Sequence, residues 1–290
     1  MRARIFQIVL LLLILSVSSC QKTDTSSETS GIKTLVIVSD NDPGSDLIVG
    51  ILGAVRSARP DMQVQFFQTK PFDVFQASYL MWVVMTDYPK GTCIAGIVEP
   101  GASSRRMVYH AGDQFVLAPD NMLSTRILDA YPMTQCYFVE NSSVLDGGIA
   151  GQLSIEEFYK RAILSLIAGT TPSAFGPACL SPLKFRVQEP LLSGDTIKGE
   201  ILFTDNFGNC ITNIPASLMA NVQDGKLLNM LADTTHLSIT MGVNYSSVSS
   251  GENVCFINNS NRLQLSVNYG DFSAKYKVAA SSKIALINAK

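Results

Sequence analysis

The chain has 290 residues, of which 47% are hydrophobic and 16% charged, and its formal net charge at pH 7 is -2. This composition excludes an intrinsically disordered chain, because it supplies enough apolar surface for a core. The balanced charge gives no basic face, so nucleic acid is not an expected partner. The length suits two modest domains.

The N-terminus predicts a secretory signal peptide over residues 1–19. Arg2 and Arg4 precede an apolar run at residues 5–17, which is too short to span a bilayer comfortably. Small residues close the run, and Cys20 follows them directly. A positively charged N-terminal region, a short apolar segment and small residues before the cleavage site are typical of export signals. The cysteine at this place resembles a bacterial lipobox, in which it is acylated after cleavage; an ordinary signal peptide with an incidental cysteine is the alternative.

Lipid anchoring would leave the folded part of the chain outside the cytoplasm. Residues 20–31 are polar and rich in serine and threonine, which predicts a flexible tether after the lipidated Cys20. Several acyl chains at one site anchor firmly, because each buried methylene contributes about 0.8 kcal/mol. Gln21 is not an aspartate retention signal, so we expect the outer membrane of a bacterial cell envelope rather than the inner membrane.

Residues 32–185 predict an α/β layer domain. Short apolar, β-branched runs alternate with helical segments, and this alternation favours a mostly parallel sheet covered by helices. Ser154 and Glu157 have the spacing of a capping box before the clearest amphipathic helix. The expected strands are Lys33–Val38, Val64–Phe67, Cys93–Val98, Met107–His110 and Gln114–Leu117, and the expected helices are Leu47–Ala58, Asp73–Thr86, Leu123–Ala130 and Ile155–Ala168.

Residues 186–290 predict a second, all-β domain. Apolar runs separated by turn signals replace the alternating pattern, which is typical of a small barrel or sandwich. The change from alternating strands and helices to strands alone places the domain boundary near residues 180–190. The expected strands are Asp195–Thr204, Cys210–Asn213, His236–Met241, Asn253–Ile257, Arg262–Val267 and Lys283–Ile287.

The cysteines and histidines predict neither a disulfide framework nor a metal site. If Cys20 is lipidated, five widely spaced cysteines remain, and an odd set does not form a framework. Most lie in apolar stretches and are expected to be buried small hydrophobes, although an oxidising compartment would permit one disulfide. There is no CxxC pair and there are only two histidines, which argues against zinc.

Short motifs occur in a definite order along the chain. The most specific motif is the D-x-F-G-N-x-I-T-N run at residues 205–213. The other segments are Ser39–Asn41 with Asp46–Gly50, Pro71–Val74, Tyr88–Thr92, Val98–Ser103 with Arg105 and Arg106, Ala118–Met122, Gly199–Ile201, Asn259–Ser260 and Asn268–Gly270. Together they resemble the S-adenosylmethionine (SAM) hydroxide adenosyltransferase family, which also contains SAM-dependent fluorinases and chlorinases. The resemblance implies an N-terminal α/β domain, a C-terminal β-barrel and a homotrimer in which SAM lies between domains of neighbouring subunits.

The resemblance also implies a reaction that needs no metal or redox cofactor, with SAM as substrate. Hydroxide or halide attacks the ribose C5′ carbon, and the neutral methionine thioether leaves. The protein mainly aligns the nucleophile and removes its water. Asp40 follows a predicted strand, where α/β sheets place ligand contacts, and matches the family residue that accepts both ribose hydroxyls. A loop cap or Asx turn is the alternative for Asp40.

Five further residues are carried over from the family motifs. Asp205 would face the ammonium group of the methionine end of SAM, and Asn209 would form a hydrogen bond to the same end. The alternative is a β-turn, because the D-N-F-G-N sequence is also typical of turns. Ser260 would complete the carboxylate pocket. Phe207 would support the adenine region or else belong to the core. Asp73 would be the catalytic residue beside the attacking water, or else a helix N-cap.

The chain departs from the family pattern where hydrolase-type members carry a polar cluster with His and Arg. The H-G-R-D segment is replaced by residues 152–157, and the only histidines, His110 and His236, lie in predicted strands. Two motif glycines are replaced by Ser103 and Met122. Three functions stay open: a SAM-hydrolysing enzyme, a lipid-anchored protein that binds SAM or a nucleoside without turnover, and an assembly component with an empty pocket.

Overall fold

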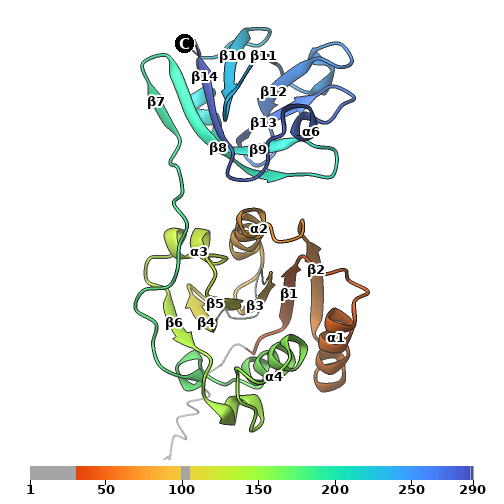
Figure 1. Cartoon of the computed structure of the whole chain (residues 1–290), viewed down its shortest axis with the longest axis vertical. Coiled ribbons are helices and arrows are strands. Elements are labelled where there is room, and N and C mark those ends of the chain that lie inside the picture. The colour runs from red at the N-terminus through yellow and green to blue at the C-terminus, as the bar shows by residue number, and fades with distance from the viewer. Residues whose placement is uncertain (1–30, 99–104, 288, 290) are drawn as a thin grey trace, which may run out of the picture.

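Two sheets organise the chain, one in each half of the sequence (Figure 1). The computed structural model describes residues 31–98, 105–287 and 289. The predicted signal peptide, the lipidation site at Cys20 and Ser103 lie outside the described residues. Within the described part, no helix has both the length and the apolar character needed to cross a bilayer.

The first half forms a six-stranded sheet in the order β2-β1-β3-β5-β4-β6. All register pairs among β1, β2, β3 and β5 are parallel, whereas β4 runs antiparallel to both of its neighbours. This confirms the predicted mostly parallel α/β sheet. The strands are β1 (Thr34–Ser39), β2 (Gln63–Gln68), β3 (Thr92–Ile97), β4 (Arg106–Ala111), β5 (Gln114–Pro119) and β6 (Gln135–Phe138).

Helices cover both faces of this sheet. The core on one face packs against α1 (Asp46–Ala58) and α4 (Ile155–Ile167), and the core on the other face packs against α2 (Val74–Asp87) and α3 (Thr125–Ala130). Figure 1 shows α2 and α3 between the sheet and the second domain. Three-residue and four-residue 3-10 helices, η1 (Ser142–Leu145), η2 (Pro172–Phe175) and η3 (Tyr245–Ser247), lie in the connections.

The predicted capping box at the start of α4 is only half formed. Ser154 Oγ accepts a hydrogen bond from Glu157 N at 3.1 Å, as expected of an N-cap. The side chain of Glu157 instead forms ion pairs with Lys160 and Arg161. The prediction of a reciprocal bond from the glutamate was therefore wrong, because two cations one turn away compete for the same carboxylate.

The second half forms a closed β-barrel. Seven strands follow the order β14-β10-β11-β12-β13-β9-β8, and pairing of β14 with β8 closes the ring. This confirms the predicted barrel-like all-β domain. The elements are β7 (Leu191–Ser193), which extends β8 at its edge, β8 (Thr196–Thr204), β9 (Cys210–Pro215), α5 (Ala216–Met219), β10 (Leu227–Ala232), β11 (Thr235–Met241), β12 (Asn253–Ile257), β13 (Arg262–Val267), α6 (Phe272–Tyr276) and β14 (Lys283–Ile287).

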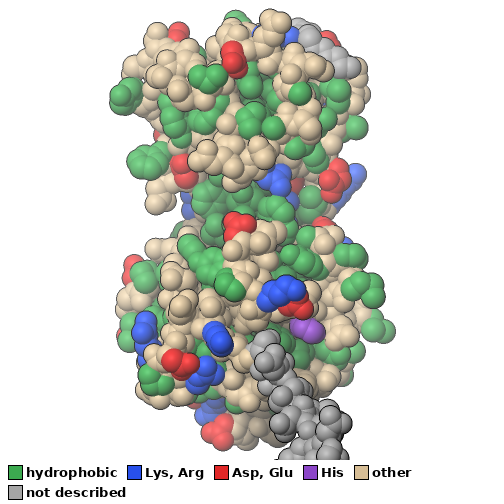
Figure 2. Space-filling model, turned by 180° about the vertical axis from the view of Figure 1, so that it is seen from behind, with side chains coloured by type: hydrophobic (Ala, Val, Ile, Leu, Met, Phe, Trp, Pro, Cys, Tyr) green, Lys and Arg blue, Asp and Glu red, His purple; other side chains and the backbone are tan. Residues whose placement is uncertain are grey.

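Helices α2 and α3 pack against the barrel through buried polar contacts. Gln76 Oε1 of α2 accepts a hydrogen bond from Thr204 N at 3.3 Å. Arg126 of α3 pairs with the buried carboxylate of Glu200 at 2.9 Å, and Lys283 pairs with the same carboxylate. Charged side chains of both signs gather at the waist between the domains in the view of Figure 2. The junction therefore holds an ion pair whose partners come from different domains.

Two cysteines lie opposite each other beside the edge strand β6. Tyr137 and Ala178 form an antiparallel bridge, and Cys179 N donates to the Cys136 carbonyl at 2.8 Å. This register places Cys136 directly across from Cys179. Residues that face each other across antiparallel strands have Cα atoms about 4.5–5.5 Å apart, which is within the range that a disulfide spans. All five described cysteines are free thiols in the structure.

Oxidised glutathione is expected to join Cys136 to Cys179. Burial raises the pKa of Cys136 to about 12, so the partly exposed Cys179 is the thiol that attacks first. Each thiol loses a hydrogen, and oxidised glutathione is reduced to two glutathione molecules. Peptide mapping under non-reducing conditions should find the linked pair in the wild type and none in Cys179→Ser. A glutathione adduct on Cys179 without a linked peptide would contradict the expectation.

Candidate functional site

Asp40 lies at the carboxyl end of β1 and is fixed by the loop that follows β2. Its Oδ2 accepts a hydrogen bond from Phe72 N at 2.9 Å, and Oδ1 lies 3.4 Å from Asn41 Nδ2. Phe72 has a φ of 60° and an exposed side chain. A carboxylate has about four lone-pair positions, so Asp40 keeps acceptor capacity for a ligand.

Asp73 is the N-cap of α2, as one of the two sequence interpretations predicts. Its Oδ1 accepts a hydrogen bond from Gln76 N at 2.9 Å. Its Oδ2 has no hydrogen-bond partner among the described residues, so capping uses only one of its two oxygens. Because Phe72 N bonds Asp40, the loop after β1 that carries Asp40 lies beside the loop after β2 that carries Asp73.

Asp205 organises the turn between β8 and β9. Its Oδ1 accepts from Phe207 N and Asn209 N, both at 2.9 Å, and its Oδ2 accepts from Asn209 Nδ2 at 2.8 Å. Gly208 in this turn has a φ of 79°, and an added Cβ would lie 1.9 Å from Asp271 Oδ1, so glycine is required there. Three of about four acceptor positions on Asp205 are used, which leaves room for one further donor.

A hollow of about 660 Å³ lies beside this turn on the barrel. Phe207 is 77% exposed and Tyr269 is 93% exposed, whereas Asn209 is buried at its base. The Oδ1 atom of Asn209 has no partner among the described residues. Exposed aromatic rings beside an open acceptor suit a flat ligand that carries an N–H donor. The residues lining the hollow are Phe207, Asn209, Tyr245, Ser246, Val267, Asn268, Tyr269 and Gly270.

The first turn of α2 connects the two groups of predicted residues. Gln76 bonds the backbone of Thr204, which directly precedes Asp205. The positive charge of Lys70, in the loop before Asp73, also acts on Cys210 at the end of the same turn. Burial dominates there and raises the pKa of Cys210 to about 12. Asp40, Asp73 and Asp205 thus lie on elements that meet at the domain junction.

Ser260 lies apart from the Asp205 turn. In the β9–β13 pair, Leu265 is opposite Cys210 and Arg262 is opposite Pro215. Ser260 belongs to the turn before β13 and is exposed, whereas Asp205 precedes β9. The two turns are therefore at opposite ends of the strand pair, about 17 Å apart for five residues of strand. The structure therefore does not bring Ser260 to the Asp205 turn, with which the family motifs group it.

Two residues of the Ala118–Met122 motif form hydrogen bonds with backbone groups of other segments. Asp120 Oδ1 accepts from Leu183 N, and Asn121 Nδ2 donates to the carbonyl of Val98, both at 2.8 Å. Met122 has a φ of 75°, the left-handed region that favours glycine. The backbone therefore has a glycine-like conformation at the place where the family motif has glycine.

The two histidines lie on other parts of the molecule. His110 stacks on Phe115 in the sheet, with ring centroids 5.1 Å apart, and His236 lies in β11. Within residues 31–98, 105–287 and 289, no group of three or more His, Cys, Asp or Glu side chains is arranged to hold a metal ion.

An α/β domain joined to a closed barrel, with carboxylates at their junction, is the architecture of a known family of SAM-acting proteins. The model of the SAM hydroxide adenosyltransferase N-terminal domain matches residues 36–176, and that of the C-terminal domain matches residues 199–285. The chain belongs to the SAM hydroxide adenosyltransferase family. It is 26% identical over 181 residues to the (R)-S-adenosyl-L-methionine hydrolase of Thermus thermophilus, covering 60% of this chain and 70% of that protein.

Solved structures share the fold. An uncharacterized conserved protein from Thermotoga maritima superposes with a TM-score of 0.76 at 21% identity, covering 87% of this chain and 99% of that one. A conserved hypothetical protein from Thermus thermophilus superposes with a TM-score of 0.67 at 19% identity, covering 88% of this chain and 100% of that one. At these identities the likeness establishes the two-domain fold and nothing finer.

Proposed function

We propose that this protein hydrolyses SAM to adenosine and L-methionine. The observation that carries the proposal is the family match across both domains of one chain, beside a relative named as a SAM hydrolase. SAM is the substrate, and the proposal includes no further cofactor. In the reaction a water oxygen forms a bond to the ribose C5′ carbon while the C5′–S bond breaks. The bonding electron pair stays on sulfur as a neutral thioether, and the water releases a proton.

The proposed roles follow from the open acceptor positions. Asp40 accepts the ribose hydroxyls, and Asp205 with Asn209 holds the amino-acid end. Ser260 is left out of this set because it lies at the other end of the β9–β13 pair. Phe207 supports the adenine ring. Asp73 orients the attacking water through the oxygen that does not cap α2. Because the leaving group is already a good one, alignment and removal of water supply most of the acceleration.

The assembly and location of the protein are part of the proposal. A homotrimer would place the Asp40 loop of one copy against the barrel hollow of a neighbour, so that SAM is enclosed between copies. A signal peptide over residues 1–19 and a lipid on Cys20 would anchor this assembly in the cell envelope, with its domains outside the cytoplasm. The sequence pattern in residues 1–31 supports this location.

A binding protein without turnover is the second candidate. One observation favours it: the segment at residues 152–157 has neither His nor Arg, and its Ser154 acts as a helix cap. In that case the carboxylates of Asp40 and Asp205 would hold SAM or a nucleoside, and no product would form. Retention of Asp73 with a free Oδ2 favours the enzyme instead.

Incubation of the purified protein with SAM distinguishes these candidates. Adenosine and methionine, separated by chromatography, should appear in equal amounts and in proportion to enzyme concentration. Saturable binding of SAM or adenosine in calorimetry, without formation of products, would contradict the enzyme and support the binding protein. Absence of both products and binding would contradict both and favour a structural role with an empty pocket.

A further inference from the structure

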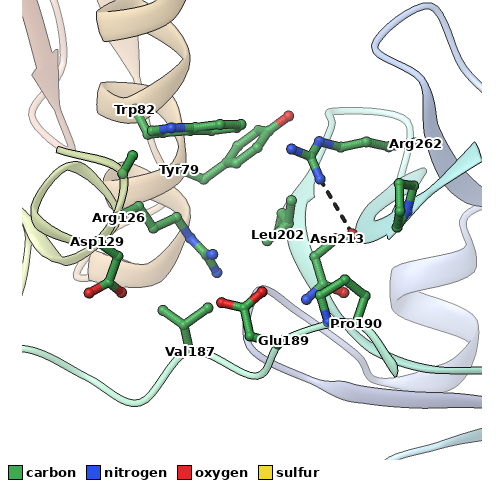
Figure 3. A pocket seen from close by; sticks show the side chains of 12 residues that line it. Tyr79, Trp82, Arg126, Asp129, Val187, Glu189, Pro190, Leu202, Asn213 and Arg262 are labelled. Carbon is green, nitrogen blue, oxygen red and sulfur yellow. Dashed lines mark hydrogen bonds between the residues drawn. The ribbon is translucent and has the colours of Figure 1, made fainter. Parts of the chain in front are cut away.

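A second cavity, of about 350 Å³, lies between the two domains of the same chain. Its walls come from α2 and α3 on one side and from β8, β9 and the start of β13 on the other, and the linker before β7 also lines it (Figure 3). It shares no lining residue with the hollow beside Phe207. This cavity is therefore a separate feature from the proposed SAM site.

Arg262 brings to this cavity a positive charge that has no ion pair among the described residues. Its side chain points from β13 toward Tyr79 in Figure 3. The guanidinium lies 5.2 Å from the centroid of the Trp82 ring, and Nη1 donates a long bond of 3.4 Å to the Asn213 carbonyl. No described carboxylate forms an ion pair with Arg262. Burial lowers the pKa of this guanidinium, and Arg126 acts in the same direction. A partly desolvated cation with one weak acceptor is costly without an anion.

The other charged residues of the lining are Arg126, Asp129 and Glu189. Arg126 pairs with Glu200 at 2.9 Å, and Asp129 pairs with Lys184 at 2.6 Å. Glu189 of the linker is exposed, and in Figure 3 its carboxylate points toward Arg126. Among the lining cations, Arg262 is therefore the one that no described carboxylate pairs with, and it is the group that an anionic ligand would meet. A second negative charge on the ligand would be disfavoured by Glu189, so a monoanion suits the cavity better than a dianion.

The remaining walls are apolar and flat. The rings of Tyr79 and Trp82 lie 5.9 Å apart, and Leu202, Pro190 and Pro215 complete the lining. Tyr79 adds a phenol whose pKa is raised by burial, so it stays a neutral donor. We propose that this cavity binds a small organic monocarboxylate, with its carboxylate on Arg262 and its apolar body against Tyr79 and Trp82. This site is independent of SAM turnover.

Trp82 reports directly on this cavity, because it is the only tryptophan of the chain. Titration with benzoate should change its fluorescence saturably, whereas benzamide, a neutral molecule of the same shape, should bind at least about tenfold more weakly. Phenyl phosphate should also bind more weakly than benzoate because of its second charge. Equal binding of benzoate and benzamide, or tighter binding of phenyl phosphate, would overturn the proposal.

The variant Arg262→Met keeps the packing on Trp82 and removes the charge. It should lower benzoate affinity at least about tenfold without lowering the Tm of the ligand-free protein, since the charge without an ion pair is gone. Arg56→Met, on the exposed face of α1, should leave benzoate binding unchanged. If Arg262→Met bound benzoate as tightly as the wild type does, the proposal would be overturned. If this variant does not fold, the comparison of benzoate with benzamide on the wild-type protein tests the proposal instead.

Discussion

Asp40→Asn is expected to lower kcat/KM for SAM by roughly a hundredfold to ten-thousandfold. In the proposed function the carboxylate accepts two ribose hydroxyls, and bonds to a charged acceptor contribute about 1.5–3 kcal/mol each. Each 1.4 kcal/mol corresponds to about a factor of ten. Asparagine has a similar shape, and its oxygen can still accept the bond from Phe72 N. The effect should therefore be seen in SAM turnover measured by product chromatography, with the fold unchanged by circular dichroism.

Asp42→Asn is a suitable control for this variant. Asp42 lies two residues further along the same loop, is exposed, and accepts a bond from Gly44 N at 2.8 Å. Its replacement should change kcat/KM by less than about twofold, within the usual range of surface substitutions. Equal activity of Asp40→Asn and wild type would remove Asp40 from the site while leaving the family assignment in place.

Glu200→Ala is expected to destabilise the protein by about 3–5 kcal/mol, because it leaves Arg126 buried without its anion. The carboxylate of Glu200 is 2% exposed and also pairs with Lys283 and accepts from Gln188 N at 3.3 Å. Urea denaturation followed by Trp82 fluorescence measures the loss, since this tryptophan lies at the domain junction. The transition should move to lower urea concentration.

A second substitution tests the physical reason for that loss. Adding Arg126→Met to Glu200→Ala removes the unpaired charge and should recover part of the stability. Glu189→Ala, an exposed glutamate of the linker, should change the free energy of unfolding by less than about 0.5 kcal/mol. If Glu200→Ala unfolded at the same urea concentration as the wild type, the interdomain ion pair would not stabilise the junction.

The fold could be predicted largely from the sequence, because its strands are continuous apolar runs. All eleven strands that the pattern predicts are present in the structure within a few residues. The missed strands lack that signal. Strand β6 is a four-residue edge strand, Q-C-Y-F, and β7 has three residues. Strand β10 places Leu227 on the surface, so its L-L-N-M-L-A run has no clean alternation of apolar and polar residues.

The arrangement of the site could be predicted only in part. The turn at Asp205 and the helix cap at Asp73 could be predicted from the local sequence, because each carboxylate bonds backbone N–H groups no more than four residues away. The bond between Gln76 and Thr204 joins residues 128 positions apart, which no spacing rule predicts. Motif order grouped Ser260 with Asp205, but the length of the β9–β13 pair separates their turns. The sequence marked Met122 as a departure from the family, whereas only the backbone reveals its φ of 75°.

The measurement that tests the central claim most directly is hydrolysis of SAM in water enriched in the heavy oxygen isotope. Attack of water at C5′ puts the solvent oxygen into the 5′-hydroxyl of adenosine, so mass spectrometry should find every new adenosine carrying the label and the methionine unlabelled. Adenosine formed without the label would contradict attack by water at C5′. Absence of adenosine at any enzyme concentration would contradict the hydrolase assignment and favour the binding protein.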